Sequence, residues 1–258
     1  MSMVVKGLVI RTTDIYEADR LITIFTDEMG VITALAKSAR SIKSRKLVAT
    51  MLFCYSSFVI YQRGEHYYIK EAALIESFYD IRRSVEGLAL ASYVVDVLSD
   101  VTVAQEEHEL LRLSLNTLYA ISTAKCSLEK IKAAFEIRAA SILGFMPDVL
   151  SCSSCGEKLG VFYFDIMGGM LKCYACCERE RAQHKEPEDP HNSRIVSILS
   201  EGAKIALGYC IHSPIEKIFS FSVSDEDMHI FARASEDYLI NQLERSFKTL
   251  EFYKEVTT

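Results

Sequence analysis

Four of the eight cysteines in the sequence form two Cys-x-x-Cys pairs. Cys152 and Cys155 lie in CSSC, Cys173 and Cys176 lie in CYAC, and seventeen residues separate the two pairs. Two thiolates three positions apart can bind one ion from a tight turn, and two such turns complete a tetrahedron. The spacing therefore predicts one zinc ion. Because four cysteine ligands leave no open coordination position, the metal is predicted to be structural and not catalytic.

The other interpretations of these pairs are buried thiols without a metal and a redox-active Cys-x-x-Cys. Unligated thiols seldom occur as matched pairs, and neither pair lies in a thioredoxin-like βαβ context. Cys177 competes with Cys176 as a ligand, but it would form a looser turn with Cys173, which favours Cys176. The isolated cysteines are predicted to be buried apolar residues: Cys54, Cys126 and Cys210.

The segment AKSARSIKSRK, residues 36–46, contains five Lys or Arg residues and no acidic residue. It is part of a longer stretch between Glu28 and Glu65 that has six cations and no Asp or Glu. Since the net charge of the chain is −6, the residues outside this +6 stretch sum to −12. Cations two or three positions apart on an extended segment can follow successive phosphates of a nucleic acid. A solvated loop is the alternative interpretation.

Aromatic residues are frequent in the strands that follow the basic segment. Unpaired bases stack on exposed aromatic rings, which would suit a nucleic-acid surface. Aromatic residues at alternate positions of a strand are also typical of a protein core, so both interpretations stay open. The residues concerned are Phe53, Tyr55, Phe58, Tyr61, Tyr67 and Tyr68.

The elements that must position these residues change character along the chain. Residues 1–80 contain short segments rich in β-branched and aromatic residues, separated by turn signals, which predicts a small barrel of the SH3 or OB type. Later segments have apolar residues three and four positions apart, which predicts amphipathic helices. The predicted strands are 4–14, 21–30, 31–40, 53–64 and 66–78, and the predicted helices are 84–101, 107–122, 127–145, 193–209 and about 225–256.

The cysteine pairs interrupt the helical pattern. Residues 161–165 and 170–173 are strand-like on either side of a turn at Met167–Gly169, which predicts a zinc-ribbon-like module. Residues 178–192 are polar and contain two prolines, which predicts an exposed linker. The predicted fold class is therefore multidomain α+β, with a barrel followed by a helical domain that carries an inserted zinc-ribbon-like module.

Sequence motifs of common enzyme classes are absent. The chain has no phosphate-binding GxxxxGK[ST] loop, no GxSxG nucleophile elbow, no HExxH and no paired-carboxylate site. No run approaches the roughly 18 apolar residues that a membrane-spanning helix needs, and no signal-peptide cleavage pattern is found. We therefore predict a cytoplasmic protein that is not an enzyme and does not bind a membrane.

Several segments together resemble the RecO family of bacterial recombination mediators. In the N-terminal segment, a strand leads into Tyr16–Arg20, then a second strand ends near Gly30 and a basic segment follows. The resemblance covers nearly the whole chain. Its segments are GLVIRTTDIYEADRLITIFTDEMGVITALAKSAR, LIESFYDIRRSVEGLALASYVVDVL, FEIRAASILGFMPDVLSCSSCG and YLINQLERSFKTLEFY.

The resemblance implies an OB-fold DNA-binding domain over residues 1–80 and a helical domain over 81–258, with the zinc module at 148–182. It implies binding of single- and double-stranded DNA, annealing of complementary strands and a nucleoid-associated location. It also implies that the partner RecR and this chain together help RecA replace single-strand-binding protein on DNA. By position, the residues implied to contact DNA are Lys37, Arg40, Lys43, Arg45 and Lys46, with Arg20 as a further candidate.

One departure from the family pattern lies in the basic segment, where relatives commonly have Gly in place of Ser38. A serine would restrict this turn if its backbone requires a positive φ. Two other functional classes stay open from the residues alone. The first is a zinc-ribbon adaptor that acts by protein contacts in transcription or translation. The second is an enzyme of nucleic-acid metabolism, which would need a carboxylate cluster or an open metal site.

Overall fold

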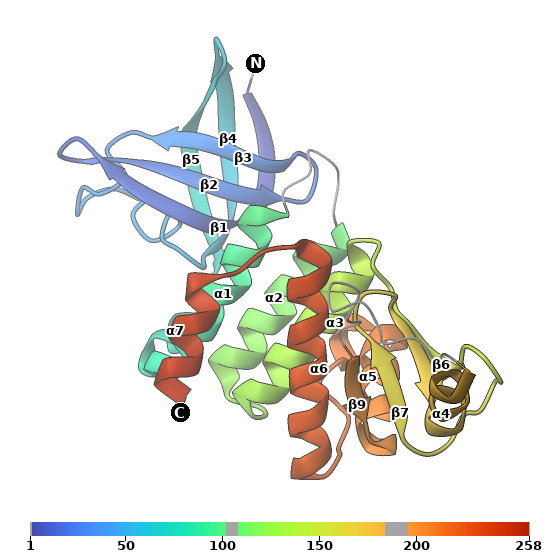
Figure 1. Ribbon diagram of the computed structural model, residues 1–258. Helices are drawn as coiled ribbons and strands as arrows, with labels where there is room; N and C mark the ends of the chain where they lie inside the picture. Colours follow the sequence, from blue (N-terminus) through green and yellow to red (C-terminus); the bar gives the residue numbers. More distant parts are fainter. Residues whose placement is uncertain (1, 102–107, 184–195, 258) are drawn as a thin grey trace. The chain divides into compact units, whose positions relative to one another are not determined.

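The computed structural model describes residues 2–101, 108–183 and 196–257. The described chain forms two compact units (Figure 1). The first unit comprises the residues up to Lys125 together with those from Phe247 onward, and the second comprises Cys126–Ser246. The predicted division into domains at residue 80, with the zinc module at 148–182, stays a prediction. Within the described ranges, no helix is both long and apolar enough to cross a membrane.

Five strands of the first unit close into a barrel, in agreement with the predicted OB-like fold (Figure 1). The strand order is β1-β2-β3-β5-β4, and β4 closes the barrel by pairing antiparallel with both β1 and β5. Closure leaves no free strand edge, which protects the sheet from pairing with other chains. The strands are β1 (Ser2–Ile15), β2 (Asp19–Thr26), β3 (Gly30–Ala36), β4 (Tyr55–Arg63) and β5 (His66–Glu76).

The barrel core follows the two-residue period of its strands. Ile22 and Ile24 of β2, and Phe58 and Ile60 of β4, are fully buried, while the residues between them are only half-buried. Gly7 of β1 lies directly against Ile24 and Phe25 of β2. A Cβ at Gly7 would lie 2.4 Å from Ile24 Cγ2, so this position has no room for a larger residue.

The first unit also contains helices. Three follow the barrel strands in sequence, and a fourth lies at the C-terminal end of the chain. The Ser84 side chain accepts a hydrogen bond from the Gly87 N–H and caps the first long helix, as Ser does at many helix N-termini. The C-terminal helix α7 packs against α1, with the Phe247 ring edge-on to Tyr93 at 5.7 Å between centroids. The helices are η1 (Tyr79–Arg83), α1 (Val85–Asp100), α2 (His108–Thr123) and α7 (Lys248–Thr257).

The second unit combines helices with a four-stranded sheet of order β6-β8-β7-β9. Helices α3 and α6 pack against each other, and Phe162 and Phe164 of the sheet are fully buried. The helices are α3 (Leu128–Ile142), α4 (Tyr174–Gln183), α5 (Glu201–His212), η3 (Ile215–Lys217) and α6 (Asp225–Leu243). The strands are β6 (Asp148–Cys152), β7 (Phe162–Asp165), β8 (Met170–Cys173) and β9 (Val196–Leu199).

The prediction of a single helix over 193–209 is wrong for Val196–Leu199, which form strand β9, and correct from Glu201 onward, where α5 begins. Strand β9 pairs antiparallel with β7, which places Ile198 opposite Tyr163. Ser200 ends the strand, and its side chain accepts a hydrogen bond from the Ala203 N–H to cap α5. The four residues VSIL fit either period, and pairing with the edge of β7 selects the strand.

The prediction of one long helix over about 225–256 is also wrong. Helix α6 ends at Leu243 because Glu244 adopts a left-handed conformation with φ 51°. The Glu244 N–H donates to the Asn241 carbonyl at 3.1 Å, which closes the last turn. The chain then starts α7 at Lys248. The break is required because α6 packs within the second unit and α7 within the first.

The predicted linker 178–192 is helical at its start. Helix α4 continues to Gln183, and the Lys172 ammonium of β8 forms an ion pair with Glu180 of this helix at 2.6 Å. The prediction of a linker is therefore wrong for 178–183, which are helical, although Glu178, Arg179 and Ala182 are exposed as predicted. The remainder, 184–192, lies outside the described residues.

Candidate metal centre and nucleic-acid interface

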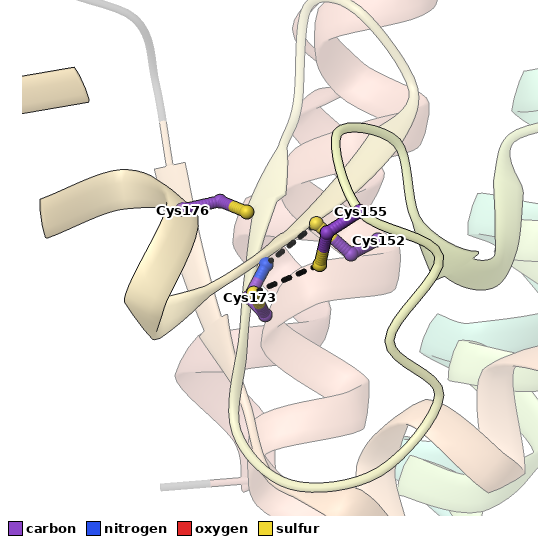
Figure 2. A group of neighbouring side chains, drawn as sticks. All are labelled: Cys152, Cys155, Cys173 and Cys176. Atoms are coloured by element: carbon purple, nitrogen blue, oxygen red, sulfur yellow. Dashed lines mark hydrogen bonds between the residues drawn. The ribbon is translucent and has the colours of Figure 1, made fainter. Parts of the chain in front are cut away.

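Four thiols meet in the second unit (Figure 2). Cys152 ends β6, Cys155 follows in a turn, Cys173 ends β8, and Cys176 lies in the first turn of α4. The four Sγ atoms all lie within 4.8 Å of one another. The structure therefore brings together the four cysteines that the sequence spacing selected. Cys177 is not part of this group.

The distances between the thiols suit one tetrahedral ion. A zinc ion binds thiolate sulfur at about 2.3 Å, so the edge of its sulfur tetrahedron is about 3.8 Å. The Sγ atoms of Cys155 and Cys173 are 3.6 Å apart, close to this edge. The four cysteines can therefore hold a metal ion with only small side-chain adjustments.

Local backbone structure forms the first turn of the cluster. The Cys152 N–H donates to the Glu157 carbonyl at 2.7 Å, and the Gly156 N–H donates to the Cys152 carbonyl at 2.9 Å. Gly156 has φ 78°, which only glycine adopts without strain. The chain thus curls around the position between Cys152 and Cys155, where a metal would bind.

A hairpin carries the second cysteine pair to the first. Strands β7 and β8 pair antiparallel, and the turn between them is fixed by Asp165. The Asp165 carboxylate accepts hydrogen bonds from the N–H groups of Met167 and Gly168 at 3.1 and 3.0 Å. The parallel pairing of β6 with β8 then places Cys152 beside Cys173, whose N–H donates to Cys152 Sγ at 3.3 Å.

The electrostatics of the cluster favour a bound cation. Burial opposes ionisation of Cys152, but N–H donors from Cys173, Ser154 and Cys155 outweigh it and lower the pKa of Cys152 to about 6. Contacts with the thiols of Cys155 and Cys173 raise the pKa of Cys176 to about 12. Without a cation, the negative charge is therefore concentrated on one sulfur. A divalent ion removes this restriction, because a coordinated thiol loses its proton.

The three isolated cysteines lie in different environments. Cys54 and Cys210 are buried, as predicted, and burial raises the pKa of both thiols. Cys126 is only half-buried, so the prediction of a buried residue is wrong there. Cys126 begins the connection into α3, where Ser127 caps the helix by accepting from the Lys130 N–H.

The basic segment 36–46 lies between β3 and β4 and is folded into consecutive turns. The N–H of Ser41 donates to the carbonyl of Ser38 at 3.3 Å, and the N–H of Ser44 donates to that of Ser41 at 2.8 Å. The segment is therefore compact, whereas the sequence suggested an extended path. Ser38 has φ 54°, so this turn does have the positive φ that serine adopts less readily than glycine.

Three of the six cations predicted to contact DNA are tied to the barrel itself. Arg20 and Arg40 share the carboxylate of Asp14, at 3.0 and 3.1 Å. The Lys46 ammonium donates to the Lys37 carbonyl at 2.6 Å, and burial lowers the pKa of Lys46. These three side chains hold the loop in place and are less available to an external phosphate.

The other three predicted cations are exposed, and the Lys37 ammonium also lies over the Tyr68 ring, 5.8 Å from its centroid. Lys37, Lys43 and Arg45 are exposed, and no hydrogen bond or ion pair to another described residue is found for their side chains. Their charge is therefore free to attract an anion. Of the six predicted cations, three therefore anchor the loop to the barrel and three can attract a phosphate.

Family models match both parts of the chain. The model described as "Recombination protein O N terminal" matches residues 1–78, and "Recombination protein O C terminal" matches residues 82–251. The chain belongs to the RecO family. The DNA repair protein RecO of Acetivibrio thermocellus is 37% identical over 251 residues, covering 96% of this chain and 95% of that protein. Its counterpart in Alkaliphilus metalliredigens is 28% identical over 254 residues, covering 97% and 98%.

Aromatic residues of this RecO-family barrel fall into two groups. Phe53 and Phe58 are fully buried core residues, which excludes them as stacking surfaces. Tyr61 and Tyr68 are half-buried and stack on each other, with ring centroids 5.3 Å apart and an interplanar angle of 17°. The core interpretation is therefore correct for the two phenylalanines and for Tyr67, which packs against the barrel core. Tyr55 and Tyr67 are also half-buried.

Two carboxylates that support the basic segment could not be identified from the sequence. Asp14 lies near the end of β1, close to the tip of the β1–β2 hairpin, and its carboxylate forms ion pairs with Arg20 and Arg40. Asp19 begins β2 and accepts a hydrogen bond from the Ser38 N–H at 2.7 Å. Both lie before the acid-free stretch, and the pairing of β2 with β1 and with β3 brings them to the loop. Nothing in their local sequence indicates this role.

Proposed function

We propose that this RecO-family chain is a non-enzymatic DNA repair mediator that binds single- and double-stranded DNA and anneals complementary strands. The observation that carries the proposal is the exposed charge of Lys37, Lys43 and Arg45 on an acid-free loop of an OB-like barrel. Two phosphate backbones repel each other, and a positive surface that holds one strand lowers this repulsion. Annealing needs no covalent chemistry, so a charged surface is sufficient.

Membership of the family supports the finer parts of the proposal. Relatives that cover nearly the whole chain are named DNA repair proteins. We propose that RecR is the partner with which the chain helps RecA replace single-strand-binding protein on DNA. We place the protein in the cytoplasm, associated with the nucleoid, since its substrate would be there.

We assign zinc to the four-cysteine site and a structural role to the metal. An all-thiolate set favours zinc over the hard cations Mg²⁺ and Ca²⁺, which prefer oxygen ligands. Cys152, Cys155, Cys173 and Cys176 would provide all four ligands, so the ion would stabilise the fold of the module and would have no free position for substrate.

Annealing of labelled complementary oligonucleotides, naked or coated with single-strand-binding protein, tests the proposal. The test variant replaces Lys37, Lys43 and Arg45 with Glu. The matched control replaces three exposed lysines elsewhere, Lys125, Lys217 and Lys248, with Glu and therefore changes the net charge equally. We expect the test variant to lose single-strand affinity, with the salt slope of log K reduced by about 2, since each lost phosphate contact contributes about 0.7.

The control variant should bind and anneal as the wild type does. Normal binding and annealing by the test variant would refute the assignment of this loop. Failure of the wild-type protein itself to bind or anneal DNA would refute the proposed function and favour a zinc-ribbon adaptor that acts by protein contacts.

A further inference from the structure

A row of four side chains crosses the outside of the barrel. The strand register places Tyr61 of β4 opposite Tyr68 of β5, and Tyr68 opposite Leu35 of β3. Leu35 in turn lies opposite Leu21 of β2. We call these four residues, Tyr61, Tyr68, Leu35 and Leu21, the outer row.

Strand alternation directs the outer row away from the barrel core. Each member of the row has a sequence neighbour that is buried in the barrel core, so the row faces the opposite side of the sheet. These neighbours are Ile60, Ile69, Ala34 and Ile22. All four members of the row are half-buried and therefore partly accessible. The next outward positions on β2 and β3 are Thr23 and Thr33, which are polar. The row is thus an apolar strip beside polar positions of β2 and β3.

The two tyrosines of the row are asymmetric in their surroundings. On one side, the Lys37 ammonium lies over the Tyr68 ring, 5.8 Å from its centroid. On the other side, the cross-strand neighbour of Tyr61 is Ser2 of β1, which is exposed and small. No large side chain from the paired position of β1 covers that side of the Tyr61 ring. The paired position on β1 therefore presents only a small side chain to an incoming base.

We infer that Tyr61 and Tyr68 form a stacking platform for an unpaired base of single-stranded DNA, with Lys37 binding a neighbouring phosphate. This inference rests on the proposed function and assigns a separate role to the aromatic pair. Base stacking is sequence-tolerant because every base has a π-face, and it needs the base to be unpaired. The cations supply the salt-dependent part of binding, and the tyrosines supply a part that selects single strands over duplex.

A tyrosine pair on adjacent strands also stabilises a sheet, so the test must separate stacking from folding. We would measure binding of oligothymidylate, of an abasic oligodeoxyribose phosphate of equal length and of duplex DNA to Tyr61→Leu, Tyr61→Phe and the control Tyr79→Leu. Tyr79 is 69% exposed and lies in η1, outside the row.

Tyr61→Leu should bind oligothymidylate roughly 5- to 100-fold more weakly, as expected for loss of one stacked base. Its affinity for the abasic strand and for duplex DNA, and its salt slope, should stay as in the wild type. Tyr61→Phe keeps the ring and should bind within about twofold of the wild type. An equal loss on all three ligands would indicate a folding defect and would overturn the inference.

The sequence contains no tryptophan, which permits a second test that does not depend on affinity. In Tyr61→Trp, oligothymidylate should quench the tryptophan fluorescence, and the abasic strand should not. In Tyr79→Trp, neither ligand should change it. Unchanged fluorescence of Tyr61→Trp at saturating oligothymidylate would overturn the inference. If replacing Lys37, Lys43 and Arg45 with Glu nevertheless weakened DNA binding in that case, the proposed function would stand without the stacking platform.

Discussion

At the scale of single residues, the basic loop of the first unit contains one residue, Ser38, with a strained backbone conformation. Ser38 has φ 54°, and its N–H donates to Asp19 at 2.7 Å, which fixes the start of the loop. A left-handed backbone costs an L-residue about 1–2 kcal/mol, whereas glycine adopts it freely. The loop thus retains a small strain next to the cations that we assign to DNA binding.

We predict that Ser38→Gly raises the unfolding midpoint slightly or leaves it unchanged, because relief of strain offsets the added freedom of the unfolded chain. Ser38→Val should destabilise by about 1–2 kcal/mol, since a β-branched residue tolerates positive φ poorly. Thermal unfolding measures both effects. Ser41→Gly is the matched control, because Ser41 is not among the described residues with positive φ. Ser41→Gly should lower the midpoint, and a midpoint as high as that of Ser38→Gly would contradict this account.

A buried ionic group in the second unit also depends on single residues. The Lys132 ammonium lies between Glu136 of α3, at 2.9 Å, and Glu236 of α6, at 2.6 Å. Burial disfavours the charge on Lys132, but the two carboxylates outweigh it and raise its pKa. Because Glu136 is fully buried, it needs this cation to remain ionised.

Lys132→Met should lower the free energy of unfolding by about 3–5 kcal/mol, because it leaves the Glu136 carboxylate buried without its cation. The double variant Lys132→Met/Glu136→Met should recover most of this loss, since an apolar pair needs no counterion. Urea titration followed by circular dichroism would give both values. If the double variant were less stable than the single variant, the penalty would not come from the unpaired carboxylate.

At the scale of elements, the metal module is a short sheet whose strands end at their ligands. Cys152 and Cys173 end β6 and β8, which lie side by side, and Cys176 lies at the start of α4. The sheet itself is small, so a bound ion would contribute much of the stability of its ends. Structural zinc commonly contributes to folding directly.

We expect one zinc per chain, released by Cys155→Ser or Cys176→Ser but retained by Cys177→Ser. Loss of zinc should make the segment 148–183 sensitive to limited proteolysis, because the two turns lose the ion that joins them. Metal content and mapped cleavage sites are the measurements. Full zinc retention by Cys176→Ser, or unchanged proteolysis of the chelated protein, would contradict a structural metal at these four cysteines.

At the scale of the whole chain, the C-terminal helix completes the first unit although the second unit lies before it in sequence. Helix α7 packs on α1, and Thr249 donates a hydrogen bond to the Asp96 carboxylate at 2.8 Å. Phe247, Leu250 and Tyr253 are buried in this unit. The chain therefore leaves the first unit after Lys125 and returns to it at Phe247.

Truncation after Ser246 should destabilise the first unit by up to about 4–9 kcal/mol, the upper limit for exposing three large apolar side chains. Hydrogen exchange should then accelerate in α1 and much less in α3 and α6. A point control lies on α7 itself. Tyr253→Ala should reproduce part of the effect, whereas Phe252→Ala, 49% exposed, should have little effect. Equal acceleration in both units would indicate that they do not unfold separately.

Much of the fold and of the metal site follows from local sequence. The β-branched and aromatic residues of VVKGLVIRTTD and FCYSSFVIYQRG, between turn signals, predict two barrel strands, because such residues favour extended backbone. Cys152 and Cys155, like Cys173 and Cys176, are close along the chain, so their spacing alone predicts a shared ion. The acid-free stretch likewise indicates a positive surface through its residue types alone.

The remaining features depend on contacts between residues that are distant in sequence. Strand β9 exists because β7 offers an edge, and α7 separates from α6 because α1 offers an apolar face. Asp14 determines which arginines are anchored, through the pairing of β1 with β2. The outer row likewise arises from the register of four strands. Local patterns determined the ligand set and most of the elements. The tertiary structure decided the other elements and which charges and rings remain available, because both depend on neighbours that the local sequence does not contain.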